Sequence, residues 1–297
     1  MKTFISFPLT NDPCGGGNQF LRNLKHELIE LAAFTNLAEE ADVILYNGHQ
    51  NAEATFNLKK LHPEKLFVHR MDGLQKLYNT PDDPRQDLAI DYNKISNATI
   101  FQSHWAKREF SKFGFNPKIN TVIHNSADSK LFNKNHIKNK NKKTELLCTS
   151  WSPNLKKGFN FYKKLDELLD FSKFNFTFIG NKPANIIYKN IKCLDPLTTS
   201  EIATYLQGVD IFVSATIDDC CSNSIIEALA SGVPVLAQDS GGNPELVKDG
   251  GLLFKDIDDF LKNIEAIRTN IDFYRKMINI KTTKEIAADY INFFKCL

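Results

Sequence analysis

Short apolar runs alternate with amphipathic helical segments along most of this chain. The helical segment NQFLRNLKHELIELA, for example, repeats its apolar side chains at the spacing of one helix face. A strand-helix-strand order is typical of a parallel sheet that is covered by helices. We therefore expect an α/β fold with doubly wound parallel sheets. The β-like runs of the first half are KTFISF, DVILY, KLFVH, ATIFQ and NTVIHN.

The alternation stops at residues 132–145, FNKNHIKNKNKKTE, a polar and lysine-rich stretch that is typical of a linker. It then restarts with ELLCTSW and continues to VPVLAQD. The chain has 297 residues, near the size at which single cores divide. We expect two similar domains, residues 1–135 and 136–297. The final segment TTKEIAADYINFFKCL is predicted to form a helix that packs back on the first domain.

Composition excludes several classes of protein. The 37 basic and 35 acidic residues give a net charge of +2, which argues against a strongly basic nucleic-acid binder. No apolar run approaches the roughly 20 residues that span a bilayer, and the first residues lack the apolar core of a signal peptide. The six cysteines form no CxxC motif, so neither a zinc site nor a disulfide framework is indicated. We expect a cytoplasmic protein.

Ligands of open parallel sheets bind at the carboxyl ends of the strands, so the loops after strands are the candidate sites. The loop DPCGGGNQF follows the first strand, and backbone amides at Gly16 and Gly17 could approach a phosphate or a sugar closely. Its spacing fits neither the dinucleotide-binding motif nor the P-loop. A plain tight turn is an equal alternative.

Two further loops carry charged side chains. FVHRMDG places His69, Arg70 and Asp72 at a strand end, which offers an acid/base, an anion fork and a carboxylate. The alternative is an Arg-Asp pair that only stabilises the loop. SWSPNLKKGF places Lys157 at a helix start, from which an ammonium can reach a diphosphate. A single lysine is more often a solvated charge.

The stretch IDDCCSNSIIEALASGVPVLAQDSGGNPELV contains a polar run that ends at a helix N-terminus. Unpaired N–H groups and the positive end of the helix dipole favour an anion there. Asp219 and Glu227 lie eight positions apart and could bracket one ligand. Ser224 and Glu227 also fit a capping box, in which the glutamate serves only the helix end.

These motifs, together with KKGF and TVIHNSADSKLF, resemble the retaining nucleotide-sugar glycosyltransferases of the GT-B fold, specifically glycosyltransferase family 4 of group 1. The resemblance implies two Rossmann-like domains that face a cleft, the first on the acceptor side and the second binding the donor. It implies that Asp219 contacts the donor sugar and Glu227 the ribose. Amides around Ser222, Asn223 and Ser224 would meet the diphosphate.

The resemblance also gives roles to the other loops. Lys157 corresponds to the lysine that binds the diphosphate, and Gly16 and Gly17 to the glycine loop that faces the donor. His69, Arg70 and Asp72 fall near the reacting sugar. The chain departs from the family at Asp219, where a glutamate is usual, at Ser222, where a glycine is usual, and at Trp151. An arginine is expected at this last position, and its loss removes a bidentate phosphate partner.

The resulting expectation is a retaining glycosyltransferase without cofactor, metal or nucleic-acid partner. Its donor would be a nucleotide-diphosphate sugar, and its acceptor a saccharide or a lipid-linked glycan in cell-surface polysaccharide or glycolipid synthesis. Peripheral association with the inner face of the cytoplasmic membrane is left open. The alternatives are a nucleotide-sugar epimerase or hydrolase of the same fold, and a non-catalytic partner subunit, which Trp151 favours.

Overall fold

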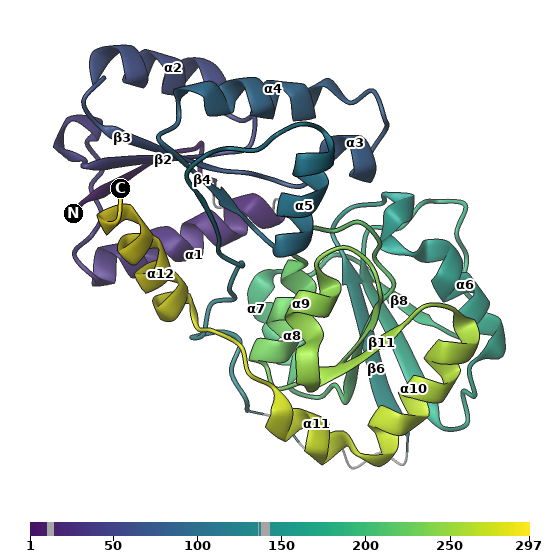
Figure 1. Ribbon diagram of the computed structural model, residues 1–297. Helices are drawn as coiled ribbons and strands as arrows, with labels where there is room; N and C mark the ends of the chain where they lie inside the picture. The colour runs from purple at the N-terminus through teal and green to yellow at the C-terminus, as the bar shows by residue number, and fades with distance from the viewer. Residues whose placement is uncertain (11–14, 136, 138–142) are drawn as a thin grey trace. The chain divides into compact units, whose positions relative to one another are not determined.

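The chain forms two α/β units in a computed structural model that describes residues 1–10, 15–135, 137 and 143–297 (Figure 1). The first unit consists of Met1–Ser126 and Lys281–Leu297, and the second of Ala127–Ile280. The segment 132–145 that was expected as a linker therefore belongs to the second unit. Part of it, residues 136 and 138–142, lies outside the described residues.

The first unit contains a five-stranded sheet in the order β1-β2-β3-β4-β5, and every neighbouring pair of strands is parallel. Tyr46 lies opposite His69 and Asn47 opposite Arg70, so these polar residues meet at the end of the β2–β3 pair. The strands are β1 (Thr3–Ser6), β2 (Val43–Asn47), β3 (Leu66–Arg70), β4 (Ala98–Phe101) and β5 (Asn120–Val122).

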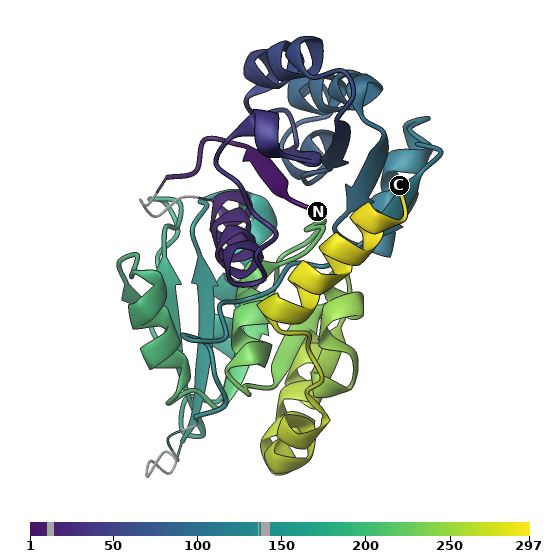
Figure 2. The same cartoon turned by 90° about the vertical axis from the view of Figure 1, so that its left-hand side faces the viewer.

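Helices cover both faces of this sheet. Helices α1 and α12 pack on one face, where the rings of Phe20 and Tyr290 lie 6.1 Å apart between centroids (Figure 2). On the other face, Tyr46, Phe67 and Tyr92 form a second apolar cluster under α2 and α4 (Figure 1). The helices of this unit are α1 (Gly16–Glu30), α2 (Ala52–Leu61), α3 (Gln75–Tyr78), α4 (Pro84–Tyr92), α5 (His104–Lys112) and α12 (Thr283–Lys295), with 3-10 turns η1 (Ala38–Glu40) and η2 (Asn93–Ile95).

The second unit contains a six-stranded parallel sheet in the order β11-β10-β9-β6-β7-β8. Its strands are β6 (Thr144–Ser150), β7 (Phe174–Gly180), β8 (Lys192–Leu194), β9 (Ile211–Ser214), β10 (Val235–Gln238) and β11 (Gly251–Phe254). Its helices are α6 (Phe159–Leu168), α7 (Thr199–Leu206), α8 (Asn223–Ala230), α9 (Asn243–Val247), α10 (Ile257–Thr269) and α11 (Ile271–Met277), with 3-10 turns η3 (Leu155–Lys157) and η4 (Lys248–Gly250).

Apolar side chains of α6 and α10 fill the core on one face of the second sheet. Phe159, Tyr162 and Phe260 are buried there against β6, β7 and β9. Helix α8 packs against β9 and β10 and buries Ile225 and Leu229. The predicted α/β class with two doubly wound parallel sheets is therefore confirmed. Among the described helices, none combines the length and the apolar character that crossing a membrane requires.

Helix α12 returns to the first unit from the end of the chain, and its packing provides a test of the fold. We expect Phe294→Ala to destabilise the first unit by about 3–5 kcal/mol, because this ring is 1% exposed and its loss leaves a cavity. Urea unfolding followed by tryptophan fluorescence and circular dichroism measures the change. The exposed neighbour Asn292 supplies the control, and Asn292→Ala should stay within about 0.5 kcal/mol of the parent. Equal stability of the two variants would contradict this packing.

Candidate functional site

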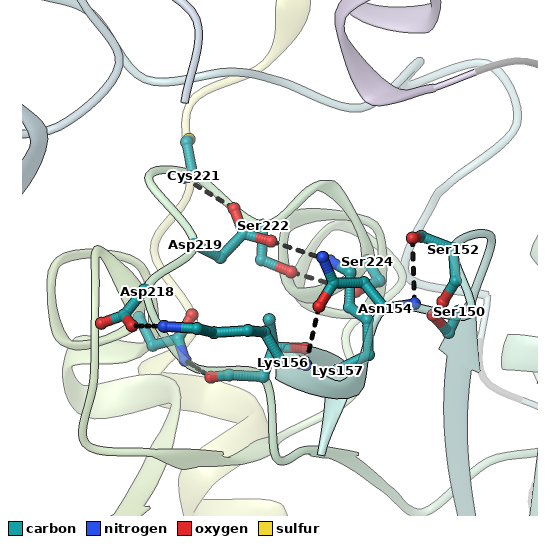
Figure 3. A network of polar contacts seen from close by, with 12 residues as sticks. Ser150, Ser152, Asn154, Lys156, Lys157, Asp218, Asp219, Cys221, Ser222 and Ser224 are labelled. Carbon is teal, nitrogen blue, oxygen red and sulfur yellow. Dashed lines mark hydrogen bonds and ion pairs between the residues drawn. The ribbon is translucent and has the colours of Figure 1, made fainter. Parts of the chain in front are cut away.

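Two lysine-carboxylate pairs join the loop after β6 to the loop after β9 (Figure 3). Lys157 ends the turn η3, and its Nζ lies 3.0 Å from Oδ2 of Asp219. The adjacent Lys156 pairs with Asp218 in the same way. The structure thus brings together Lys157 and Asp219, which the sequence analysis had assigned separately. The side chain of Lys157 is 19% exposed and that of Asp219 is 17% exposed, so a ligand can reach both.

Backbone contacts fix the position of Asp219. Its carbonyl oxygen accepts the N–H of Gly242 at 2.8 Å, and its Oδ1 accepts the N–H of Cys221 at 3.1 Å. Gly241 has a φ of +62°, and a Cβ there would lie 2.4 Å from the Asp219 carbonyl oxygen. The approach of the two loops therefore requires glycine. One carboxylate oxygen holds the turn while the other faces Lys157.

Helix α8 begins at Asn223, with Ser222 as its N-cap. The alternative of a capping box formed by Ser224 and Glu227 is therefore not present, because Ser224 lies inside the first turn rather than before it. Ser222 caps no amide through its side chain, and its Oγ lies 3.0 Å from Oγ of Ser224 instead (Figure 3). Thr198 and Thr282 do form capping boxes at α7 and α12.

The start of α8 therefore keeps the electrostatic character that favours an anion, since its N-cap side chain accepts no hydrogen bond from the first turn. Asn223 and Glu227 are four positions apart on this helix and share one face. Both are partly exposed. Asp219 belongs to the loop that leads into this helix, and Lys157 pairs with it from the loop after β6.

Trp151 directly follows β6, where the resemblance leads one to expect an arginine. Its side chain is 49% exposed. Its carbonyl oxygen accepts a hydrogen bond from Nδ2 of Asn181 at 2.9 Å, and the backbone N–H of Asn181 donates to Ser150 at 2.8 Å. The position therefore presents an aromatic surface to solvent in place of a guanidinium.

In the first unit, Arg70 is completely buried and has amide partners. Its Nη2 donates to Oδ1 of Asn125 at 2.6 Å, and its Nη1 donates to Oδ1 of Asn47. The guanidinium carbon lies 4.6 Å from the ring centroid of Phe20, within the range of a cation–π contact. Among the described residues Arg70 forms no ion pair with Asp72, so the structure does not show the alternative of a simple Arg-Asp pair.

A chain of amide hydrogen bonds connects Arg70 to Asp72. Nδ2 of Asn125 donates to Oε1 of Gln102 at 3.1 Å. Nε2 of Gln102 donates to the Met71 carbonyl at 2.9 Å and approaches Oδ1 of Asp72 at 3.3 Å. We name this set the first-unit polar cluster. Its members follow the carboxyl ends of four neighbouring strands: Asn47, Arg70, Asp72, Gln102 and Asn125.

Three members of this cluster, Asn47, Gln102 and Asn125, were not predicted from the sequence. Each was visible as a polar residue immediately after an apolar run, in VILYN, ATIFQ and TVIHN. The last of these is even part of a stretch that carried the family resemblance. The signal was weak because asparagine and glutamine at strand ends also serve common turns.

Gly16 and Gly17 lie in the first turn of α1 rather than in a loop, and Gly15 is the N-cap. The sequence had predicted that these two glycines lie in a loop, and this prediction is wrong. Residues 11–14 of the expected loop lie outside the described residues. A Cβ on Gly17 would lie 3.6 Å from Nδ2 of Asn47 and 3.9 Å from Oδ2 of Asp72. The small residue therefore brings the start of α1 up to the first-unit polar cluster.

His69 is fully buried, and both of its ring nitrogens have partners. Nδ1 faces Nδ2 of Asn93 at 3.1 Å, and Nε2 faces the Gly48 carbonyl at 2.8 Å. An amide N–H at Nδ1 requires the ring proton to be on Nε2, so the neutral ring donates to Gly48. The ring also stacks on Tyr46 at 4.3 Å. Burial lowers the pKa of His69 to about 4. The structure therefore shows a neutral imidazole that holds the loop after β2.

No three histidine, cysteine, aspartate or glutamate side chains gather as a possible metal site within the part of the chain that the structure describes. The described cations at the candidate sites are the side chains of Lys156 and Lys157 in the second unit and Arg70 in the first.

The two parallel sheets with their helices match the fold of GT-B glycosyltransferases of known structure. Sucrose-phosphate synthase from Thermosynechococcus elongatus has a TM-score of 0.74 and 13% identity, covering 100% of this chain and 97% of that one. HepE of Anabaena in complex with UDP has a TM-score of 0.75 and 15% identity, covering 100% of both chains. The catalytic domain of starch synthase IV from Arabidopsis thaliana has a TM-score of 0.66 and 13% identity, covering 95% and 78%. At such identities the likeness is one of fold.

Residues 136–270 match the family described as Glycosyl transferases group 1. This part of the chain, somewhat less than half of it, is therefore similar to group 1 glycosyltransferases, in agreement with the resemblance seen in the sequence. The assignment to family 4 stays a prediction. No curated protein sequence matches the chain.

The buried His69 makes stability depend on pH. Its folded-state pKa of about 4 is below the ordinary value of 6.5, so between these values the unfolded chain binds a proton that the folded chain does not. Stability should therefore fall as pH falls through this window, by about 1.4 kcal/mol per pH unit from this group. Urea unfolding at several pH values between 7 and 4 should show a shallower slope for His69→Gln. The exposed His26 is the control, and a His26→Gln slope reduced equally would contradict the assignment.

Gly241 offers a test of the loop that holds Asp219. We expect Gly241→Ala to destabilise the second unit by more than about 2 kcal/mol, because the strained φ and the clash with Asp219 act together. Gly114 is the matched control, since its φ is +78° and a Cβ there meets nothing within 4 Å. Gly114→Ala should cost only about 1–2 kcal/mol. Thermal unfolding of both variants measures the difference, and equal costs would argue against the close approach.

Proposed function

We propose that this protein is a retaining glycosyltransferase that uses a nucleotide-diphosphate sugar as donor and a saccharide as acceptor. The observation that carries the proposal is the arrangement in the second unit, where Lys157 pairs with Asp219 beside a helix whose N-cap serine caps no amide. This arrangement supplies a cation and oriented N–H groups for a diphosphate. The match of residues 136–270 to group 1 glycosyltransferases supports the same reading.

In this proposal the diphosphate displaces the carboxylate of Asp219 as the partner of Lys157. Negative charge grows on the diphosphate as the bond to the sugar breaks, and Lys157 with the first amides of α8 stabilises that charge as it develops. Asp219 is then released to contact the sugar hydroxyls. Glu227, one turn further along α8, binds the ribose hydroxyls.

Retention follows from attack of the acceptor hydroxyl on the same face from which the diphosphate leaves, with the leaving phosphate as base. The fixed cations perform the charge neutralisation, so the proposed reaction needs no divalent metal and no cofactor. The first-unit polar cluster, with Asp72 as its partly exposed carboxylate, is the proposed acceptor side. Cytoplasmic location and a role in cell-surface glycan synthesis stay predictions from the sequence.

The solved neighbours support a nucleoside diphosphate without fixing its base. HepE structures contain UDP, UDP-glucose, or UDP and glucose, whereas starch synthase IV contains ADP and acarbose. We propose UDP as the first nucleotide to test, with ADP and GDP beside it.

Calorimetric titration of these nucleotides tests the donor site. One nucleotide should bind saturably, and Glu227→Ala should weaken it by roughly tenfold or more, because hydrogen bonds to a charged group contribute roughly 1.5–3 kcal/mol. Glu167→Ala is the control, since this glutamate is exposed on α6 of the same unit. The buffer contains EDTA, so a requirement for added Mg²⁺ would contradict the metal-free proposal.

Two other outcomes separate the alternatives. If the folded protein binds no nucleotide, the departures from the family pattern at Trp151, Asp219 and Ser222 have removed donor binding. The protein would then be a non-catalytic partner subunit. If nucleotide is released from the sugar donor at the same rate with and without saccharide acceptors, the hydrolase reading is favoured.

A further inference from the structure

A groove of about 520 Å³ lies in the first unit beside α5. One wall is a single face of that helix, which carries His104, Lys107, Arg108 and Ser111 at successive helical spacings. The loop between α5 and β5 forms the opposite wall. Helix α5 follows β4 (Figure 1), and the first-unit polar cluster lies at the carboxyl ends of β2 to β5.

The charge in this groove is positive and unbalanced. Neither Lys107 nor Arg108 has an ion-pair partner among the described residues, and no carboxylate lines the groove. The acidic residue of α5, Glu109, pairs with Lys112 instead, at 2.6 Å between Oε1 and Nζ. Two neighbouring unpaired cations on one wall of a concave site attract an anion, and arginine favours the oxygen geometry of phosphate.

The opposite wall supplies an unsatisfied acceptor. Nδ2 of Asn120 donates to the Pro117 carbonyl at 2.7 Å, which fixes the orientation of the amide. Its Oδ1 is buried and has no hydrogen-bond partner in the described part of the chain. A buried acceptor without a partner is costly, so a donor from a ligand would stabilise it. A sugar hydroxyl is such a donor.

Two phenylalanine rings line the apolar part of the groove. Phe101 and Phe115 meet edge to face at 6.1 Å between ring centroids, and both are at least nine-tenths buried. Aromatic rings of this kind suit the apolar face of a pyranose ring. The groove therefore combines two cations, one unsatisfied acceptor and an aromatic floor.

We propose that this groove binds a phosphate-bearing saccharide. Lys107 and Arg108 bind the phosphate, Oδ1 of Asn120 accepts a sugar hydroxyl, and the edge of Phe115, which Phe101 supports from below, contacts the sugar. Helix α5 begins only two residues after Gln102, a member of the first-unit polar cluster. We infer that the bound group belongs to the acceptor, an identification that rests on the proposed function. Binding itself does not depend on it.

Calorimetry with glucose 6-phosphate, and with glucose as the uncharged comparison, tests the groove. The parent protein should bind the phosphosugar and not glucose, and Lys107→Gln/Arg108→Gln should weaken binding by more than about tenfold. Lys163→Gln/Lys164→Gln is the matched control, because it removes two adjacent positive charges from an exposed face of α6. Asn120→Asp is a second variant, which keeps the side-chain size and should weaken binding by adding a negative charge.

Vesicles distinguish the sources of the phosphate. Co-sedimentation with phosphatidylglycerol vesicles but not phosphatidylcholine vesicles, lost in Lys107→Gln/Arg108→Gln and kept in the control, would assign the phosphate to a lipid headgroup. Binding of glucose 6-phosphate that is lost in Lys107→Gln/Arg108→Gln and kept in the control would assign the phosphate to a soluble or polymeric saccharide. Absence of both, or equal binding by all variants, would overturn the proposal. The UDP titration is a separate measurement, so failure at the donor site is distinguishable from failure here.

Discussion

Parallel pairing of every strand is the constraint on which the rest of this structure depends. A parallel pair cannot be joined by a tight turn, so the connections are crossovers, and all of those within a sheet except the one between β7 and β8 place a helix on one face or the other. The same constraint sends the carboxyl ends of neighbouring strands to one edge. In the first unit Asn47, Arg70 and Gln102 meet there, and in the second Lys157 meets Asp219. Apolar strands thus position polar groups that are distant in the sequence.

The two edges hold their positive charge in different ways. Lys157 has a carboxylate partner and partial access to water, so an anion can exchange for that carboxylate at modest cost. Arg70 is buried, and its partners are amide oxygens and an aromatic face. These contacts offset the cost of burial without neutralising the charge. The first edge therefore holds a buried cation in a fixed position, whereas the second holds a partly exposed ion pair, which is the proposed donor site.

Sequence periodicity predicted the α/β class and most strands, because long apolar runs decide their own conformation through burial. The short strand β8 was missed, since two of its three residues are exposed and the third is only partly buried, which leaves little apolar pattern. The sequence placed Lys157 and Asp219 in two loops at the same edge of the sheet, but it did not predict that their side chains form an ion pair. The burial of His69 was not, because it depends on Tyr46 of the neighbouring strand and on Asn93. Likewise, the alternative capping box of Ser224 and Glu227 requires Ser224 as the N-cap, whereas the N-cap in the structure is Ser222, two residues earlier.

Helix α12 lies beyond the second unit in the chain but packs in the core of the first. A ribosome therefore completes the whole of the second unit before the first can bury Phe20 and Leu24 beneath Tyr290 and Phe294. The half of the protein that is synthesised first is the half that finishes folding last. During translation it carries an open apolar face that other nascent chains and chaperones can reach, until α12 has emerged and packs against it.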